Sequence, residues 1–435
     1  MRVLVTGAYG LIGSAILARL HRDGHKLIAA GRTLDEARLR FPYATWIAAD
    51  FTRLSTADAW RPLLANIDAV VNCVGVLQDG GRDDMQAVQV EGTCALFDAC
   101  AQGGVRRVVH ISAIGASNEG PTAFARTKAH ADAHLASLDL DWVVLRPSLV
   151  LAPSAYGGSA MLRGLAGLPW LTPSVESQVQ VVSSDDVADT VALCLRAAAP
   201  AQAAWARETW ELTHPQIHDL GDVVAALRAW HGFPPRPRLP VPAVMFGVVA
   251  VFAEFAGRLG WRSPARATAM AQLSAGVVGD PSSWIAATGI KPRSLDTILA
   301  ERPSSVQDRW FARLYWLKPV AIVALAAFWI MTGVIALGPG RPAGMSYLIK
   351  AGLGANAAEF WLIAGSLFDI AIGLAVLVRR FTRRALQLML IVSAGYLLIG
   401  TIAAPEVWSD PLGPYTKIIP VLMMIAFTLA ILDER

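Results

Sequence analysis

The chain has 435 residues, 54% of them hydrophobic, and a formal net charge of +4. A mean hydropathy of +0.44 is too high for a wholly water-soluble protein of this length, so part of the chain is expected to face lipid. The modest charge forms no concentrated basic patch, which excludes a nucleic-acid-binding protein. The four cysteines lack metal-site spacing, so we expect small buried side chains in a reducing compartment.

A glycine-rich turn follows the first predicted strand, residues 2–6, and precedes a helix predicted over residues 14–21. The first glycine permits a tight turn, the second lets backbone N–H groups approach a pyrophosphate, and the third allows close packing of helix on strand. The triplet is informative because it stands between a strand and a helix; the alternative is a tight turn without a ligand. It predicts a dinucleotide site formed by Thr6, Gly7, Tyr9, Gly10, Leu11, Ile12 and Gly13. The first apolar segment is too short for a signal peptide, so this part is expected to stay in the cytoplasm.

Strands and helices alternate down to about residue 195, which predicts a doubly wound parallel sheet. Arg32 follows the second strand at the point where NAD-binding proteins carry an acidic residue, and no acid occurs here before Asp35. An arginine suits the 2′-phosphate of NADP, so we expect NADP and keep NAD as an alternative. A solvated arginine without a ligand is the other interpretation. Further strands are predicted over residues 26–30, 46–49, 69–73, 107–112 and 142–145.

Together these features resemble the extended and atypical short-chain dehydrogenases, whose fold is of the Rossmann type. The likeness points to the branch that contains the nucleotide-binding accessory subunit of respiratory complex I, and it covers about residues 1–300. Beyond the glycine motif it rests on pieces that fall in the family's order: Asp50-Phe51, Asn72-Cys73-Val74-Gly75, Ser112, Lys128, Arg146-Pro147-Ser148, residues 182–188 and residues 288–295.

The resemblance implies roles for several side chains. Asp50 would contact the adenine amino group, and the turn at Val74 and Gly75 would lie along the adenosine ribose. Ser112 and Lys128 match the catalytic serine and lysine of the family, and Lys128 would also bind the nicotinamide ribose. Phe51, Pro147 and Ser148 are included in the expected cofactor site.

One departure from the family concerns the catalytic tyrosine, which should stand four residues before the lysine. Here that residue is Phe124, which has no proton to give. A positioned acid or base typically contributes about 10² to 10⁴ in rate. Two alternatives therefore stay open. Ser112, Tyr156 or water supplies the proton, or the bound dinucleotide is structural or regulatory and is not turned over.

Two other patterns favour structural roles. His130 and His134 could share a helix face, but no third ligand is visible, so a solvated face is preferred to a metal site. Asp185 and Asp186 are expected to cap a helix over residues 187–196.

The C-terminal part contains four apolar runs near spanning length, residues 320–337, 360–378, 385–403 and 418–432. An aromatic and basic anchor precedes the first, and four arginines fill the loop between the second and third. By the positive-inside rule the N-terminal domain, this arginine loop and the C-terminus are expected to be cytoplasmic. Arg341 and Lys350 in the first external loop are inconsistent with this orientation. Asp369 lies within the second span, where an ionisable group usually pairs or functions. The segment loosely resembles DoxX-like membrane domains.

The expected organisation is a Rossmann domain over residues 1–200, a small α/β cap over 201–310 and a four-span bundle over 311–435. Residues 240–261 of the cap are expected to form a helix buried in the cap or lying in the membrane interface. We expect a multi-pass protein of a bacterial-type inner membrane that binds NAD(P)(H) near a lipophilic substrate such as a quinone or isoprenoid. The alternative is a non-catalytic cofactor-binding subunit or redox sensor of a membrane complex. Epimerase or dehydratase chemistry is disfavoured because it generally needs the missing phenol.

Overall fold

The computed structural model describes residues 1–80, 84–174, 177–196, 205–261 and 263–432. The chain divides into two compact units. The first, called the α/β unit, comprises Met1–Glu254 and Ser263–Ala312. The second, called the helical unit, comprises Phe255–Arg262 and Arg313–Arg435.

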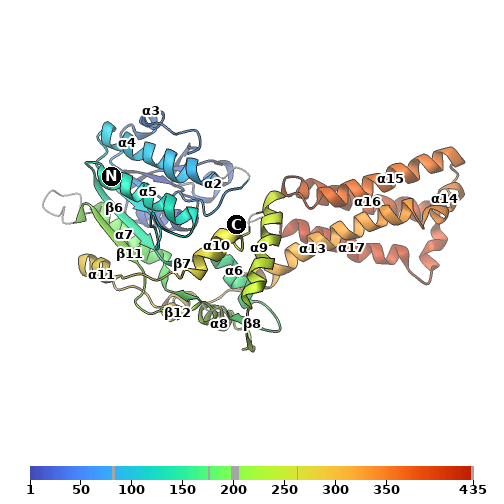
Figure 1. Ribbon diagram of the computed structural model, residues 1–435. Coiled ribbons are helices and arrows are strands. Elements are labelled where there is room, and N and C mark those ends of the chain that lie inside the picture. Colours follow the sequence, from blue (N-terminus) through green and yellow to red (C-terminus); the bar gives the residue numbers. More distant parts are fainter. Residues whose placement is uncertain (81–83, 175–176, 197–204, 262, 433–435) are drawn as a thin grey trace. The chain divides into compact units, whose positions relative to one another are not determined.

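A parallel sheet forms the centre of the α/β unit (Figure 1). Its carboxyl edge has a topological switch between β1 and β4, because the chain winds outward from β1 in one direction and then in the other. In the described part of the chain it has seven strands in the order β11 (Glu208–Leu212), β6 (Asp141–Pro147), β5 (Arg107–Ile111), β4 (Ala69–Asn72), β1 (Arg2–Thr6), β2 (Lys26–Gly31) and β3 (Thr45–Ala48).

Both faces of the sheet are covered by helices, as a parallel sheet requires. Successive residues of β1 point to opposite faces, so Val3 and Val5 belong to one core and Leu4 to the other. The first core includes side chains of α1 (Leu11–Arg22), α2 (Asp35–Arg40) and α7 (Ser184–Arg196). The second includes side chains of α3 (Ala57–Trp60), α4 (Thr93–Gly103) and α5 (Ala123–Ser137). The predicted doubly wound sheet is confirmed.

Smaller elements pack beside the main sheet. Three short strand pairs are β7 (Leu149–Leu151) with β10 (Val181–Ser183), β8 (Thr172–Ser174) with β13 (Arg238–Pro240), and β9 (Gln178–Val179) with β12 (His218–Asp219). The helices are α6 (Gly157–Ala166), α8 (Leu220–Trp230), α9 (Ala243–Arg258), α10 (Ala267–Ser274), α11 (Ser282–Thr288) and α12 (Leu295–Ala300). Short turns lie at η1 (Arg61–Leu64) and η2 (Ala87–Gly92).

Asp185 and Asp186 bind arginines rather than capping a helix start. They lie in the first turn of α7, and Asp186 is buried against Arg293, whose backbone N–H and guanidinium both donate to its carboxylate. Asp185 accepts a hydrogen bond from Arg302 Nη2 at 2.7 Å. The expectation of capping carboxylates is therefore corrected: this pair fixes the segment after α11 onto the α/β unit.

The helical unit consists mainly of α13 (Val306–Leu337), α15 (Ala355–Ala375), α16 (Arg379–Ala403) and α17 (Pro414–Ala430). Among the described residues, the first three are long and apolar enough to cross a membrane, and α17 is a shorter apolar helix. Between α13 and α15 lies α14 (Arg341–Lys350), and η4 (Pro405–Ser409) precedes α17. Each predicted apolar run thus corresponds to a helix that begins several residues before the run.

The aromatic and basic anchor, including Trp316, lies in α13 before the apolar run. The position of the four arginines differs from the expected loop. The four arginines form the first turns of α16, from Arg379 to Arg384.

Close approaches of small residues hold α13 against α15, since an added Cβ at Gly373 would come within 2.7 Å of Ile330. Asp369 is buried in this bundle and bonds to the Tyr396 side chain.

Candidate cofactor and active site

The glycine turn leaves no room for side chains where a dinucleotide would approach. Gly7 has a φ of +61°, and an added Cβ would lie 2.8 Å from the Cys73 carbonyl oxygen. An added Cβ at Gly13 would strike the Gly7 carbonyl oxygen. Gly10 is the N-cap of α1, so the unpaired N–H groups of that helix face the turn. The predicted cradle is therefore built in this chain, and its shape and donors fit a pyrophosphate.

Tyr9 and Arg32 meet at the end of β2. The Tyr9 hydroxyl accepts a hydrogen bond from the Arg32 backbone N–H at 3.2 Å, and an added Cβ at Gly31 would lie 2.2 Å from the Tyr9 ring, which would have to shift. The Tyr9 ring also stacks on Trp46, with ring centroids 6.1 Å apart. The Arg32 side chain is exposed. A cation thus stands beside the carboxyl end of β2, where the 2′-position of an adenosine ribose would lie.

The residues expected around the adenine lie at the end of β3. Asp50 is half-buried, and its Oδ1 accepts from the Thr52 hydroxyl at 2.8 Å and from the Thr52 backbone N–H. Phe51 is buried instead, with its ring 4.9 Å from that of Trp60. Any contact of Phe51 with a cofactor would therefore use its backbone, because its side chain belongs to the core.

Lys128 lies on α5 with its ammonium group buried between two loops. Its Nζ donates to the Ile111 carbonyl at 2.9 Å and to the Val74 carbonyl at 3.3 Å. Gly75 is next to it, since a Cβ there would lie 3.5 Å from Nζ. Burial lowers the pKa of Lys128 to about 8, although the charge of Asp132 acts in the opposite direction. The ammonium is therefore close to its titration point at neutral pH.

Ser112 is tied to a carboxylate that the sequence analysis did not single out. Its hydroxyl donates to Asp132 Oδ2 at 2.9 Å, and Arg146 donates to the same oxygen through Nε at 3.0 Å and Nη2 at 2.8 Å. Burial raises the pKa of Asp132, while the charge of Arg146 opposes that rise. With donors on this oxygen, Asp132 functions as an acceptor.

A second missed residue, His110, extends this group across the sheet. Asn72 Oδ1 accepts from the Thr6 hydroxyl at 2.6 Å and from the Val74 N–H at 3.3 Å, so the Asn72 amide nitrogen faces His110 Nδ1 at 3.2 Å. His110 Nδ1 is then the acceptor, and its proton lies on Nε2, 3.5 Å from Asp132 Oδ1. Burial lowers the pKa of His110 well below its usual value, so the ring is neutral.

Signals for both residues were present in the sequence. Asp132 stands four residues after Lys128, on the same face of a helix. His110 is a polar residue between the apolar side chains of Val109 and Ile111 in β5. The network joins the carboxyl ends of β1, β4, β5 and β6 through hydrogen bonds that only the sheet order brings together.

Several buried polar atoms around this network have no hydrogen-bond partner among the described residues. Ser148 Oγ is one, at the end of β6, and Pro147 beside it is also buried. Gln89 Oε1 is another; its amide nitrogen donates to Thr127, and the side chain borders Gly75. Gln89 lies in the π-helical turn η2, a feature often found at functional sites. Buried unpaired groups are rare, and a bound ligand would satisfy them.

Three other residues from the sequence analysis, Phe124, Tyr156 and His134, lie on α5 or at the start of α6. Phe124 is half-buried one turn before Lys128 on α5. Tyr156 is 39% exposed at the start of α6. His134 pairs with Asp98, with Nε2 2.8 Å from a carboxylate oxygen. In the described part of the chain no group of three or more His, Cys, Asp or Glu residues could hold a metal ion.

The segment after α9 packs against the two loops that border Lys128. Ser263 accepts a hydrogen bond on its carbonyl from Gln78 at 2.8 Å, and Arg266 Nη1 donates to the Asp79 carbonyl at 2.6 Å. In α10, Gln272 Oε1 accepts from the Thr122 hydroxyl at 2.9 Å. These contacts lie on the loop after β4 and at the N-cap of α5, so this segment borders one side of the site.

Comparison with known families agrees with both halves of the chain. A family model for NAD(P)H-binding proteins matches residues 7–198, and a model for the DoxX-like family matches residues 326–426. This chain is an NAD(P)H-binding Rossmann domain joined to a DoxX-like domain. The expected resemblance is therefore confirmed for both halves.

Relatives of the NAD(P)H-binding domain have varied descriptions. An uncharacterised protein of Mycobacterium tuberculosis is 30% identical over 43% of this chain, and the chain spans 19% of that protein's length. A UDP-glucose 4-epimerase of Mycolicibacterium smegmatis is 34% identical over 28% of this chain and 42% of its own length. Subunit 9 of the NADH dehydrogenase alpha subcomplex of Rattus norvegicus is 26% identical over 33% of this chain and 39% of its own length.

The fold of the NAD(P)H-binding domain recurs in solved structures. The crystal structure of gox2253 has a TM-score of 0.54 and 22% identity, covering 72% of this chain and 98% of that one. At this identity the likeness concerns the fold alone.

Proposed function

We propose that this protein is a membrane-anchored NADPH-dependent reductase that acts on a lipophilic carbonyl or quinone. NADPH, when bound, supplies a hydride to the substrate, and the reduced substrate oxygen then takes up a proton. The residues of this chain have to bind the coenzyme, orient the substrate and supply that proton.

The observation that carries the proposal is the position of Lys128. An ammonium group has three N–H donors, and in the described structure the carbonyls of Ile111 and Val74 accept two hydrogen bonds from it. One N–H is thus available to a ribose hydroxyl or to the substrate oxygen. A pKa of about 8 makes this ammonium a competent acid near neutral pH, in place of the phenol that Phe124 lacks. After transfer, Lys128 regains its proton from water.

The glycine cradle and Arg32 support the choice of coenzyme. The free N–H groups at the start of α1 suit a pyrophosphate, and the exposed Arg32 cation suits a 2′-phosphate. We propose that Asp50, Val74 and Gly75 line the adenosine side, and that Ser148 with Lys128 lines the nicotinamide side.

The apolar helices support the choice of substrate. A reductase joined to membrane-spanning helices has ready access to substrates that dissolve in lipid. We propose that the arginines at the start of α16 lie on the cytoplasmic side, following the positive-inside rule, and that the coenzyme site faces the same compartment of a bacterial-type inner membrane.

The test uses the full chain in lipid nanodiscs with NADPH and a short-chain ubiquinone analogue. We expect NADPH oxidation that depends on the quinone and falls about 10² to 10⁴-fold in Lys128→Met. The matched control is His130→Ala, an exposed substitution on the same helix, which should leave the rate unchanged. Tight NADPH binding without any oxidation, across quinones and carbonyl lipids, would contradict the proposal.

A second candidate function is supported by Phe124 itself. A site that binds the coenzyme but has lost its phenol suits a non-catalytic subunit or a redox sensor that assembles with a membrane complex. This candidate predicts that NADPH and NADP⁺ change the binding of a membrane partner and that neither is consumed.

A further inference from the structure

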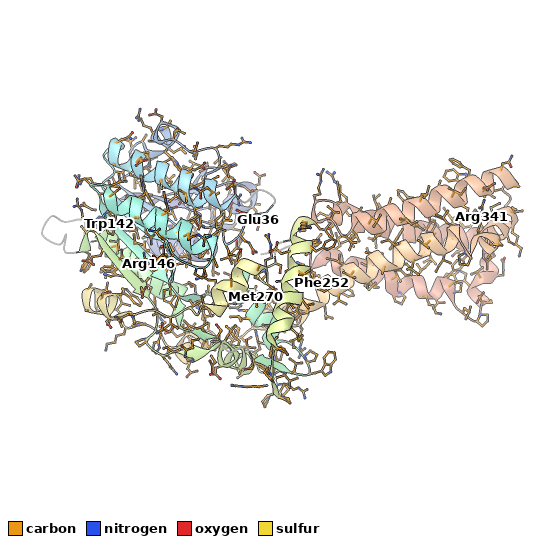
Figure 2. All side chains as sticks on the ribbon, in the orientation of Figure 1. Glu36, Trp142, Arg146, Phe252, Met270 and Arg341 are labelled. Carbon is orange, nitrogen blue, oxygen red and sulfur yellow. The ribbon has the colours of Figure 1, made fainter. Side chains whose placement is uncertain are left out.

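Helix α9 presents a row of large apolar side chains to the solvent. Phe252 is 69% exposed and Phe255 61%, and Met245, Val248 and Val249 are exposed beside them (Figure 2 labels Phe252). Their spacing of three or four residues places them along one stripe of the helix. Apolar patches of this kind are usually covered by a partner or a membrane.

The opposite side of α9 is occupied by the α/β unit. Ala253 is buried, and Glu254 pairs with Arg266 Nη2 at 2.8 Å. Arg266 in turn holds the loop after β4 through the Asp79 carbonyl. The helix therefore has one attached face and one exposed apolar face.

The residues that follow α9 are fixed at the arginine end of the apolar bundle. The Leu259 carbonyl accepts from the Arg379 N–H at 2.9 Å, and Trp261 Nε1 donates to the Leu377 carbonyl at 2.7 Å. The Arg379 guanidinium lies 5.4 Å from the centre of the Trp261 ring. Tryptophan and arginine are typical of the boundary between lipid tails and headgroups.

We propose that α9 is an interfacial helix whose exposed stripe lies in the bilayer surface, with anionic phospholipid as its partner. Arg258 ends the helix, and Arg380, Arg383 and Arg384 at the start of α16 supply cations at the same end of the bundle. Apolar residues entering the acyl boundary beside cations that meet lipid phosphates are the features of a surface-lying helix. Leu259 and Trp261, which follow the stripe in the chain, bind the apolar bundle, and this favours lipid over a water-soluble partner.

This proposal concerns a binding surface and needs no turnover. Its link to catalysis rests on the proposed function: Arg266 joins α9 to the loop after β4, and the Val74 carbonyl of that loop accepts a hydrogen bond from Lys128.

The experiment places an environment-sensitive fluorophore on Phe252→Cys in the full chain, reconstituted in vesicles of phosphatidylcholine and phosphatidylglycerol. The unsubstituted chain, treated with the same reagent, corrects for labelling of native cysteines. Leu39→Cys on α2 is the matched control, because Leu39 is an exposed apolar side chain of the same unit. Met245→Cys provides a second position on the stripe.

We expect the labels at residues 252 and 245 to be quenched by lipids carrying a shallow doxyl group and to be several-fold less accessible to iodide than the label at residue 39. Equal iodide quenching at residues 252 and 39 would overturn the proposal. Shielding from iodide without quenching by doxyl lipid would also overturn it, because protein would then cover the stripe. The readout does not involve NADPH, so its failure is distinct from failure of the proposed reaction.

Discussion

Ser112 and Asp132 are joined by a 2.9 Å hydrogen bond from a serine hydroxyl to a buried carboxylate, twenty residues apart in the chain. The bond orients the Ser112 hydroxyl, whose proton points to Asp132. Arg146 binds the same carboxylate oxygen, so the three side chains behave as one group. Ser112, which follows β5, is therefore held by a side chain of helix α5.

Asp132→Asn should weaken this group. The amide keeps the size of the carboxylate but loses its charge, and hydrogen bonds to charged groups typically contribute about 1.5–3 kcal/mol. We expect a loss of about 2 kcal/mol in the free energy of unfolding, measured by denaturant titration of the detergent-solubilised chain. Asp98→Asn neutralises a half-buried partner of His134 and should change stability by less than about 0.5 kcal/mol. If both substitutions lowered the free energy of unfolding equally, the buried network would contribute no more to stability than the Asp98–His134 pair.

Quinone reduction should fall as the pH rises through about 8. Burial lowers the pKa of Lys128 from 10.5 to about 8, so the acidic form is lost above that pH. The same shift affects stability with the opposite trend. Between pH 8 and 10.5 the unfolded chain binds the proton more strongly, so unfolding free energy at this site rises with pH. Lys128→Arg keeps a charge that does not titrate in this range, so the rate that remains in this variant should be low and should not fall through pH 8. A pH profile unchanged in this variant would exclude Lys128 as the titrating group.

Phe124→Tyr should increase the rate if the site performs hydride transfer. The new phenol would lie on α5 one turn before Lys128. The ammonium group of Lys128 would lower the pKa of a neighbouring phenol. We expect a gain of about 10- to 100-fold in kcat with little change in coenzyme affinity. Phe124→Leu serves as the control for altered packing. No gain, with binding intact, would favour the accessory or sensor function.

Gly13→Ala should weaken coenzyme binding. The added methyl group would strike the Gly7 carbonyl oxygen and force the turn away from the start of α1. We expect NADPH affinity, measured by fluorescence titration, to fall by more than about tenfold, together with a stability loss of about 1–3 kcal/mol. Gly103→Ala is the matched control, because nothing lies within 4 Å of a Cβ there.

Arg32→Glu should reverse the coenzyme preference. Loss of a charge-assisted hydrogen bond to a 2′-phosphate corresponds to about 10- to 100-fold in affinity. NADPH binding should weaken by that factor while NADH binding improves or stays constant, as an acidic side chain suits a free ribose. If the two coenzymes respond alike, Arg32 does not read the 2′-position.

Local patterns in the sequence are sufficient to predict the parallel sheet, the glycine cradle and the apolar helices. Short continuous apolar runs are typical of strands buried on both faces, and Gly7 and Gly13 stand where a strand meets a helix. The network of Asn72, His110, Asp132 and Ser112 could not be predicted in this way, since sheet order brings together residues that are far apart in the chain. Tertiary structure also turned Asp186 from an expected cap into a partner of Arg293, because a buried carboxylate is stabilised by a cation more than by solvent.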